Sequence, residues 1–435
     1  MDIRLDTILN MMVTCLAENV FLGLFLRELS GLKPLKSNVC EESFKELYRS
    51  LWVEFAQSSE YAANYAVCDG SYQTSEFRGG ISIVYARALA HQYQGNKLVD
   101  SIPQISIKAE HGPQYASYYM KALELRTLQA ALQGCPDESL AIYDGTLYPI
   151  LPPDIAKFSD QEAEACSEWL EALQDLYEYS LNHRHLLLAI SKDSRVSYAR
   201  VRALVTSLRN VDSHLAEIAS REQSRKRIAE LLRGLGPHLK NYLQEFERPT
   251  SDEEVFEDLT PNAGFSKALV LAPQPIHLGE EVEARTKRWE TSVMRRRIRS
   301  SKKLGRVLRS LDRLFSLPPL AVFYWKPWHN IGTYRVDVGS WHLGIKDKWG
   351  DMQEDYFASD DAADRCRGIV GVLNCLSKEP YAVKSLTDVD TIVRITGKIY
   401  RDCYEPLIAD KLKSFGLKAY PTKRRIREMI LERMT

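Results

Sequence analysis

The chain has 435 residues, of which 45% are hydrophobic and 27% charged, and its 58 basic and 58 acidic residues cancel to a formal net charge of zero. This composition is typical of a globular protein with a large core, and a chain of this length usually divides into two or three units. It excludes an overall electrostatic field that attracts nucleic acid, so any nucleic-acid site must come from local clustering of charge.

The cysteines and the N-terminus indicate the compartment. The eight cysteines include no Cys-x-x-Cys pair, which favours reduced cytosolic thiols over a disulfide framework or a zinc site. The longest apolar run near the start, Val20 to Leu26, is far shorter than a membrane span. Asp2 and Asp6 stand where a signal peptide carries positive charge. We therefore expect a cytoplasmic protein without a membrane anchor.

Four segments follow one another along the chain. Residues 1–60 are predicted to form an N-terminal helical arm, because apolar residues recur there at helical spacing. Strands and helices alternate over 61–195, which we interpret as the first part of an α/β core. Residues 196–315 are interpreted as a helical insertion with a basic segment, and 316–435 as the remainder of the core with C-terminal helices.

Two apolar runs end in the same order of residues: Asp, Gly and a hydroxyl residue. The first is Tyr65–Ser71 and the second is Leu140–Thr146. We expect the first strand to end at Asp69, with Gly70 turning the chain toward a second strand that begins at Gly79. Two strands of one sheet that end in Asp69 and Asp144 could bind a divalent cation, because hard cations prefer oxygen ligands. The alternative is that Asp-Gly is here only a common turn dipeptide.

Two further candidate residues lie between and after these runs. A helix is predicted over 113–133, and Glu124 lies at the edge of its apolar stripe. Its carboxylate could point toward the strand ends, or it could face solvent as most glutamates do. A strand predicted from His185 ends in Lys192. This lysine could contact a phosphate or a developing oxyanion, or it could be an ordinary surface lysine.

The second half of the chain contains an acidic segment and a basic one. An acidic loop is predicted at 248–262, and positive charge is concentrated at 281–315. A basic amphipathic helix there could bind a phosphodiester backbone, a membrane surface or an acidic partner, or its charges could simply face water. Strands are predicted at 320–326 and 333–338. The candidate DNA-binding residues are Arg295, Arg296, Arg297, Arg299, Lys302 and Lys303.

The order of these pieces resembles the NurA family of DNA repair nucleases from about residue 60 onward. The motifs that carry the resemblance are Ala66–Ser71, Glu124, Ile142–Leu147, Leu188–Lys192, the strand pair Tyr324–Lys326 and Tyr334–Val338, and Tyr420-Pro421. The resemblance implies an RNase H-like mixed sheet flanked by helices, with helical insertions. It also implies a manganese-dependent site, with Asp69, Glu124 and Asp144 as metal ligands and Lys192 as a phosphate or transition-state contact.

The resemblance further implies an activity and partners. Members of the family are 5′-to-3′ exonucleases on single- and double-stranded DNA and endonucleases on single strands. They are dimers that dock on a hexameric HerA-type helicase to resect DNA ends, and related pairs act in anti-phage defence. We expect two cations per site, and because oxygen ligands suit both metals, the choice between Mn²⁺ and Mg²⁺ stays open.

The chain departs from the family pattern at two places. No histidine follows Tyr420-Pro421, and Asp337 stands where the late strand pair commonly carries glutamate. The fourth site residue is therefore open among Asp337, His329 and Arg425. Two other functions also stay open: a non-catalytic DNA-binding adaptor of a helicase, and another metal-dependent phosphoryl-transfer enzyme such as a phosphatase or nucleotidyltransferase.

Overall fold

The chain divides into two compact units, Met1–Val39 and Cys40–Thr435. The computed structural model describes Leu22 and Arg27, which are helical, in the first unit. It describes residues 39–54, 64–77, 80–110, 115–149, 160–220, 225–273, 301–329, 331–379 and 381–416 in the rest of the chain. The four-segment division predicted from the sequence stays a prediction. The second unit contains the sheet and every candidate residue that the structure describes.

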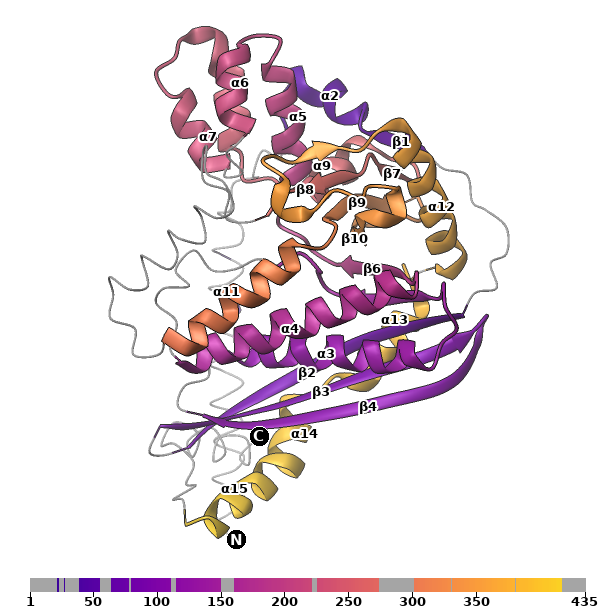
Figure 1. Ribbon diagram of the computed structural model, residues 1–435. Coiled ribbons are helices and arrows are strands. Elements are labelled where there is room, and N and C mark those ends of the chain that lie inside the picture. Colours follow the sequence, from indigo (N-terminus) through magenta and orange to yellow (C-terminus); the bar gives the residue numbers. More distant parts are fainter. Residues whose placement is uncertain are drawn as a thin grey trace. The chain divides into compact units, whose positions relative to one another are not determined.

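One mixed sheet of eleven strands organises the described part of the second unit (Figure 1). The strand order is β1-β7-β9-β10-β6-β5-β2-β3-β4, and β8 pairs with both β9 and β11. The bounds of the strands are β1 Trp52–Glu54, β2 Asn64–Phe77, β3 Ile81–Gln94, β4 Lys97–Glu110, β5 Leu140–Asp144, β6 Leu186–Ser191, β7 Gly264–Ser266, β8 Leu269–Leu271, β9 Leu320–Lys326, β10 Tyr334–Gly339 and β11 Tyr356–Phe357.

Half of this sheet has the strand pattern of an RNase H-like fold. Strands β2, β3 and β4 form an antiparallel meander. The helix Ala116–Gln133 (α3) then crosses back, so that β5 lies parallel to β2, and Asp160–Asn182 (α4) leads to β6, parallel to β5. Parallel neighbours require such helical crossovers. The predicted mixed sheet flanked by helices is confirmed.

Helices cover the sheet on both faces (Figure 1). The remaining helices, including short 3₁₀ and π turns, are η1 Glu42–Phe44, α2 Lys45–Arg49, α5 Tyr198–Leu208, α6 Ser213–Ser220, α7 Arg225–Leu232, η3 Pro237–Leu239, α8 Lys240–Glu247, α9 Asp252–Leu259, α11 Ser301–Phe315, η4 Ser340–Leu343, η5 Trp349–Asp351, α12 Asp360–Leu376, α13 Lys384–Val393, α14 Gly397–Ile399, η6 Tyr400–Tyr404 and α15 Glu405–Ser414. Within the described segments, none of the helices is both long and apolar enough to cross a membrane.

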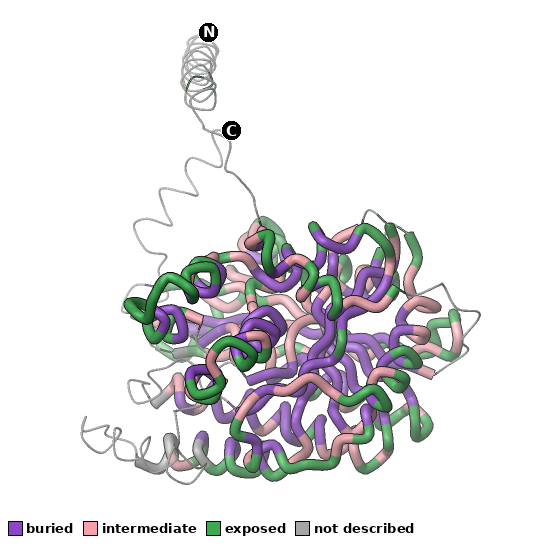
Figure 2. Tube along the Cα trace, turned by 90° about the horizontal axis from the view of Figure 1, so that it is seen from above, coloured by how far each residue is buried: buried purple, intermediate pink, exposed green. Residues whose placement is uncertain are grey.

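The core lies between the sheet and its helices (Figure 2). On one side, α3 packs on β2 and β3, and α4 packs on α3 and α11. On the other side, α13 packs on β2 and β3. Strand β2 is therefore enclosed on both faces, which explains why Ala66, Val67 and Cys68 are all fully buried. A polar residue in this part of the strand, such as Asp69, lies in a protein interior rather than at a surface.

The prediction that the first strand ends at Asp69 is wrong. Strand β2 continues through Gly70 to Phe77 and pairs with β3 along its whole length. Gly70 is not a turn residue, because it lies within β2. A Cβ at this position would lie 2.5 Å from Oε1 of Glu124 on α3. The glycine is there to let the helix approach the strand closely, and an isolated glycine in a strand can signal such an approach.

The acidic loop predicted at 248–262 is also wrong, because most of it is the helix α9. Ser251 accepts a hydrogen bond from the backbone N–H of Glu254, and the Glu254 side chain accepts one from the backbone N–H of Ser251. This capping box satisfies the first turn of the helix. The sequence signal was the Ser-x-x-Glu spacing, which the concentration of charge obscured.

Three short strands lie inside segments that were predicted to be helical. Strand β1 lies within residues 1–60 and pairs with β7, and β7 and β8 lie within 196–315 and pair with β9. Each has only three residues. Segments this short carry no measurable periodicity, and it is their pairing in the folded sheet, β1 with β7 and β7 and β8 with β9, that makes them strands.

Candidate active site

Asp69 and Asp144 lie on neighbouring parallel strands. Cys68 of β2 is in register with Tyr143 of β5, so the residues that follow them, Asp69 and Asp144, are adjacent on one face of the sheet. Asp69 is 8% exposed, and its Oδ1 accepts a hydrogen bond from the N–H of Gly70 at 2.7 Å. The parallel pairing of β2 with β5 therefore brings the two Asp-Gly motifs together.

Glu124 reaches β2 from the helix α3. It is only 1% exposed, and its Oε2 accepts a hydrogen bond from the Tyr143 hydroxyl at 2.7 Å. The space beside β2 that its carboxylate occupies is left free by the missing side chain of Gly70. Glu124 therefore faces the sheet beside Gly70, close enough for the charge of Asp69 to act on it, and does not face solvent.

Burial raises the pKa of all three carboxylates, and neighbouring acids add to the shift. Burial, and then the charge of Asp144, raises the pKa of Asp69 to about 7. Burial raises the pKa of Glu124 to about 8, to which Asp69 and Asp144 contribute, and burial also raises the pKa of Asp144. Buried like charges of this kind are stabilised by a cation, and oxygen donors suit hard divalent cations. The donor set therefore fits Mn²⁺ or Mg²⁺.

Lys192 lies directly after β6 and contacts this group. Its Nζ donates a hydrogen bond to Oδ2 of Asp144 at 2.7 Å, and its side chain is 43% exposed. Burial opposes the charge of Lys192, yet Asp144 and then the more distant Asp390 and Asp69 raise its pKa above the usual value. Lys192 is therefore a protonated, partly exposed cation at the edge of the acidic group.

The carboxylates are held by protein donors in the arrangement seen here. Among the described residues, no three His, Cys, Asp or Glu side chains converge closely enough to hold a metal ion as they stand. Asp144 is turned to Lys192 and Glu124 to Tyr143. A cation that binds here must compete with Lys192 for Asp144.

The family comparison bears directly on these residues. The sequence model of the NurA domain matches residues 64–272, a span that contains Asp69, Glu124, Asp144 and Lys192. The chain carries a NurA domain. The resemblance to the NurA family that was inferred from the motifs is confirmed, and no curated protein matches the sequence.

The chain is similar to several solved nuclease structures at low identity. The NurA nuclease from Sulfolobus solfataricus is 16% identical, with a TM-score of 0.47 over 87% of this chain and 92% of that one. A NurA bound to dAMP and manganese is 16% identical, with a TM-score of 0.40 over 90% and 96% of the two chains. An endonuclease V from Bacillus subtilis is 12% identical, with a TM-score of 0.18 over 34% and 53%.

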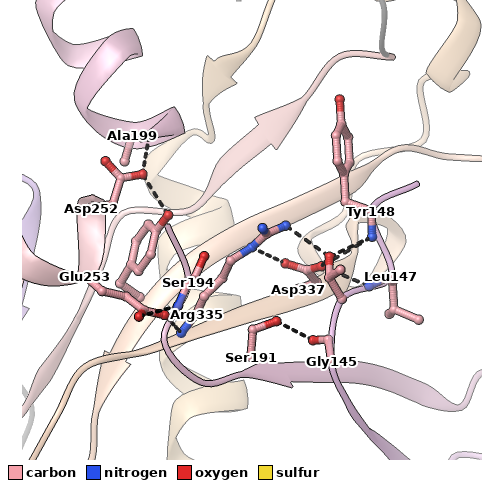
Figure 3. A network of polar contacts seen from close by, with 12 residues as sticks. Gly145, Leu147, Tyr148, Ser191, Ser194, Ala199, Asp252, Glu253, Arg335 and Asp337 are labelled. Atoms are coloured by element: carbon pink, nitrogen blue, oxygen red, sulfur yellow. Dashed lines mark hydrogen bonds and ion pairs between the residues drawn. The ribbon is translucent and has the colours of Figure 1, made fainter. Parts of the chain in front are cut away.

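A buried polar network holds the loop that follows Asp144 (Figure 3). Oδ2 of Asp337 on β10 accepts hydrogen bonds from the Thr146 hydroxyl at 2.6 Å and from the N–H groups of Leu147 at 3.0 Å and Tyr148 at 3.3 Å. Its Oδ1 accepts one from Nε of Arg335 at 2.8 Å. The carboxylate of Asp337 thus positions the chain after Asp144 within the NurA domain.

The same network holds the loop that follows β6. Glu253 of α9 accepts hydrogen bonds from the N–H of Ser194 at 2.7 Å and from that of Arg335 at 3.2 Å (Figure 3). Ser191 donates to the carbonyl of Gly145, which joins the two loops. Sequence reasoning missed Glu253 and Arg335. The one available signal for Glu253 was its place in the first turn of a capped helix.

The other candidate residues lie apart from the acids or outside the described residues. His329 follows β9, three strands away from β5, and its Nδ1 contacts the Pro261 carbonyl at 2.8 Å. Lys302 and Lys303 lie in α11, whose Arg306 pairs with Glu171 of α4 at 2.5 Å. The candidates outside the described residues are Arg295, Arg296, Arg297, Arg299 and Arg425.

We expect Glu124→Gln to stabilise the metal-free protein above neutral pH. The pKa of Glu124 rises from 4.5 to about 8 on folding. The neutral carboxyl therefore contributes stability that is complete below pH 4.5 and is lost as the pH rises to 8. Glutamine does not ionise, so the variant should gain roughly 4 kcal/mol over wild type by pH 8.

Urea denaturation in EDTA between pH 5 and pH 8 measures this difference. Glu46→Gln is the matched control, because Glu46 is an exposed helical glutamate with an 83% exposed side chain, and it should change stability by less than about 0.5 kcal/mol. A gap between Glu124→Gln and wild type that stays constant across this pH range would contradict the assignment.

Proposed function

We propose that this chain is a divalent-metal-dependent nuclease that hydrolyses phosphodiester bonds of DNA at the site formed by Asp69, Glu124 and Asp144. The observation that carries the proposal is the placement of Asp69 and Asp144 on adjacent parallel strands, with Glu124 packed against the neighbouring Gly70, inside a NurA domain. A protein keeps such a group of like charges, at a cost in stability, where the charges have a function.

Each residue would have a distinct role. Divalent cations at this site would activate the attacking water and stabilise the leaving oxygen. Asp69 is the candidate to bridge two cations, because it is adjacent to Asp144 and its charge acts on Glu124. Lys192 is partly exposed and pairs with Asp144, so it would exchange this partner for a phosphate oxygen of the DNA as the cation takes Asp144.

The finer parts of the proposal rest on the family resemblance alone. They are 5′-to-3′ exonuclease and single-strand endonuclease activity, two Mn²⁺ or Mg²⁺ ions per site, and a homodimer in the cytoplasm. They also include docking on a hexameric HerA-type helicase, in DNA end processing or anti-phage defence. The basic segment around Arg295–Lys303 is proposed to bind the DNA backbone, which requires affinity to fall steeply with added salt.

The test is cleavage of end-labelled single- and double-stranded DNA by the full chain with Mn²⁺, Mg²⁺, Ca²⁺ or EDTA. We expect shortened products with Mn²⁺ or Mg²⁺ and none with EDTA. Intact DNA that is bound under every condition would instead support a non-catalytic adaptor. Free phosphate released from small phosphate esters, with intact DNA, would support another phosphoryl-transfer enzyme.

A further inference from the structure

The C-terminal helices follow the face of β2 that carries Asp69. The N–H of Ile395 donates a hydrogen bond to the Ser71 hydroxyl at 3.1 Å, and the Gln73 side chain donates one to the Ile395 carbonyl at 2.9 Å. Further along, the Ser75 hydroxyl donates to the Tyr400 hydroxyl at 3.0 Å. The C-terminal segment therefore runs along β2 in the same direction as the strand, and each part of the segment has a fixed neighbour on β2.

A second contact, between Ser385 of the C-terminal segment and Tyr65, which precedes Asp69 on β2, fixes the same alignment. Burial raises the pKa of Tyr65, and a hydrogen bond with the Ser385 side chain opposes the shift. Tyr65 and Ser71 lie on the same face of β2 as Asp69, because side chains of a strand alternate. Asp390 is midway between Ser385 and Ile395, and this places it at about the level of Asp69 along the strand.

The position of Asp390 is rigid. Its helix α13 buries Leu386, Val389 and Val393 against the core. Arg87 of β3 holds the end of the helix, because its Nε donates to the Val393 carbonyl at 2.7 Å and its Nη2 donates to the Arg394 carbonyl at 2.9 Å. A carboxylate on such a support keeps its direction, which is what a binding site requires.

Asp390 also interacts electrostatically with the residues of the site. Burial is the main cause of the raised pKa values of Asp69 and Asp144, and the charge of Asp390 adds to both; for Lys192, whose pKa burial lowers, Asp144 and then Asp390 raise it. The side chain of Asp390 is 27% exposed and pairs with the exposed guanidinium of Arg394 at 3.0 Å. Arg394 is therefore a partner that Asp390 can give up at little cost.

We propose that Asp390 is the fourth acidic residue of this site and that its carboxylate binds, directly or through water, the divalent cation that Asp69 and Asp144 share. The inference rests on the proposed function and extends it to a residue outside the NurA domain match, which ends at 272. It gives the role of fourth residue to α13 and not to Asp337, His329 or Arg425. With this carboxylate the cation has ligands from β2, β5 and α13.

The test measures Mn²⁺ binding to the full chain by isothermal titration, with DNA cleavage as a second readout. We expect Asp390→Asn to weaken Mn²⁺ binding and cleavage by about 10-fold or more, and Asp390→Glu, which keeps the carboxylate, to recover part of the loss. Asp388→Asn is the matched control. Asp388 lies on the same helix and pairs with Lys384 at 2.5 Å, so it should match wild type.

The variant Arg394→Gln distinguishes two roles of Asp390: binding the metal ion, or acting only through its ion pair with Arg394. If Asp390 acts only through Arg394, both variants lose binding equally, and the proposal is overturned. If it binds the cation, Arg394→Gln binds Mn²⁺ at least as tightly as wild type. Asp390→Asn with wild-type affinity, while wild type and Asp388→Asn bind and cleave, overturns this inference alone. Wild type that neither binds Mn²⁺ nor cleaves overturns the proposed function with it.

Discussion

Asp69→Asn protein is expected to cleave DNA more than about 100-fold more slowly than wild type, since even the partners of metal ligands are worth 10- to 100-fold. Asp69 is adjacent to Asp144 across the β2–β5 pairing, and its charge also acts on Glu124. Asparagine has the same shape but cannot supply the negative charge that attracts the cation. Initial rates on end-labelled DNA with saturating Mn²⁺ measure the effect.

The stability of the Asp69→Asn variant shows whether the loss of cleavage comes from the changed site or from unfolding. Because the pKa of Asp69 is raised to about 7, its charge destabilises the fold, and Asp69→Asn should melt at the same temperature as wild type or higher. Asp100→Asn, at an exposed acid of the same sheet, is the control and should cleave normally. A folded Asp69→Asn protein with the wild-type rate would remove Asp69 from the site.

The largest effect on stability is expected at Asp337. Asp337 and Arg335 are 1% and 2% exposed and pair at 2.8 Å, and the same carboxylate accepts three hydrogen bonds from Thr146, Leu147 and Tyr148. Removing one partner of a buried pair leaves the other charge without compensation. We expect Asp337→Asn to lower the free energy of unfolding by about 3 to 5 kcal/mol, as measured by urea denaturation.

The control for this prediction is an exposed ion pair. Asp364 and Arg367 pair at 2.6 Å with side chains 76% and 50% exposed, so Asp364→Asn should change stability by less than about 0.5 kcal/mol. Because the network holds the loop after Asp144, Asp337→Asn should also weaken Mn²⁺ binding. Equal stability losses at the two aspartates would show that the network around Asp337 does not support the fold.

The strands that carry Asp69 and Asp144 could be predicted because each is a strongly apolar run followed by Asp and Gly. Their parallel pairing explains why the same motif occurs twice. The end of the first strand could not be predicted, because Gly70 is compatible both with a turn and with the close approach of a helix. What decides between them is Glu124, which is 54 residues away in the sequence and packs on Gly70 only in the folded protein.

The direction in which Glu124 and Asp390 point from their helices could not be predicted from the sequence either. Each lies beside the apolar stripe of its helix, a position from which a carboxylate can face either the sheet or solvent. Sequence periodicity does not distinguish the two. For Asp390 the deciding contacts are Ser71 with Ile395 and Arg87 with Val393, and both join residues more than 300 positions apart.

The polar network was missed for a different reason. Glu253 belongs to a run of acidic residues that is typical of a loop, and Arg335 belongs to a strand in which a buried charge is unexpected. Each is satisfied only by the other elements of the network: Glu253 by two backbone N–H groups, and Arg335 by Asp337. The members of this network come from β5, β6, α9 and β10, which are far apart in the sequence. Local sequence patterns therefore do not predict it.

The most direct test of the account is an anomalous difference map from a crystal soaked in Mn²⁺. We predict a manganese peak within about 2.5 Å of carboxylate oxygens of Asp69, Glu124 and Asp144, with Asp144 released from Lys192. Manganese bound elsewhere on the protein, with no peak near these three carboxylates and the Lys192 contact intact, would contradict it.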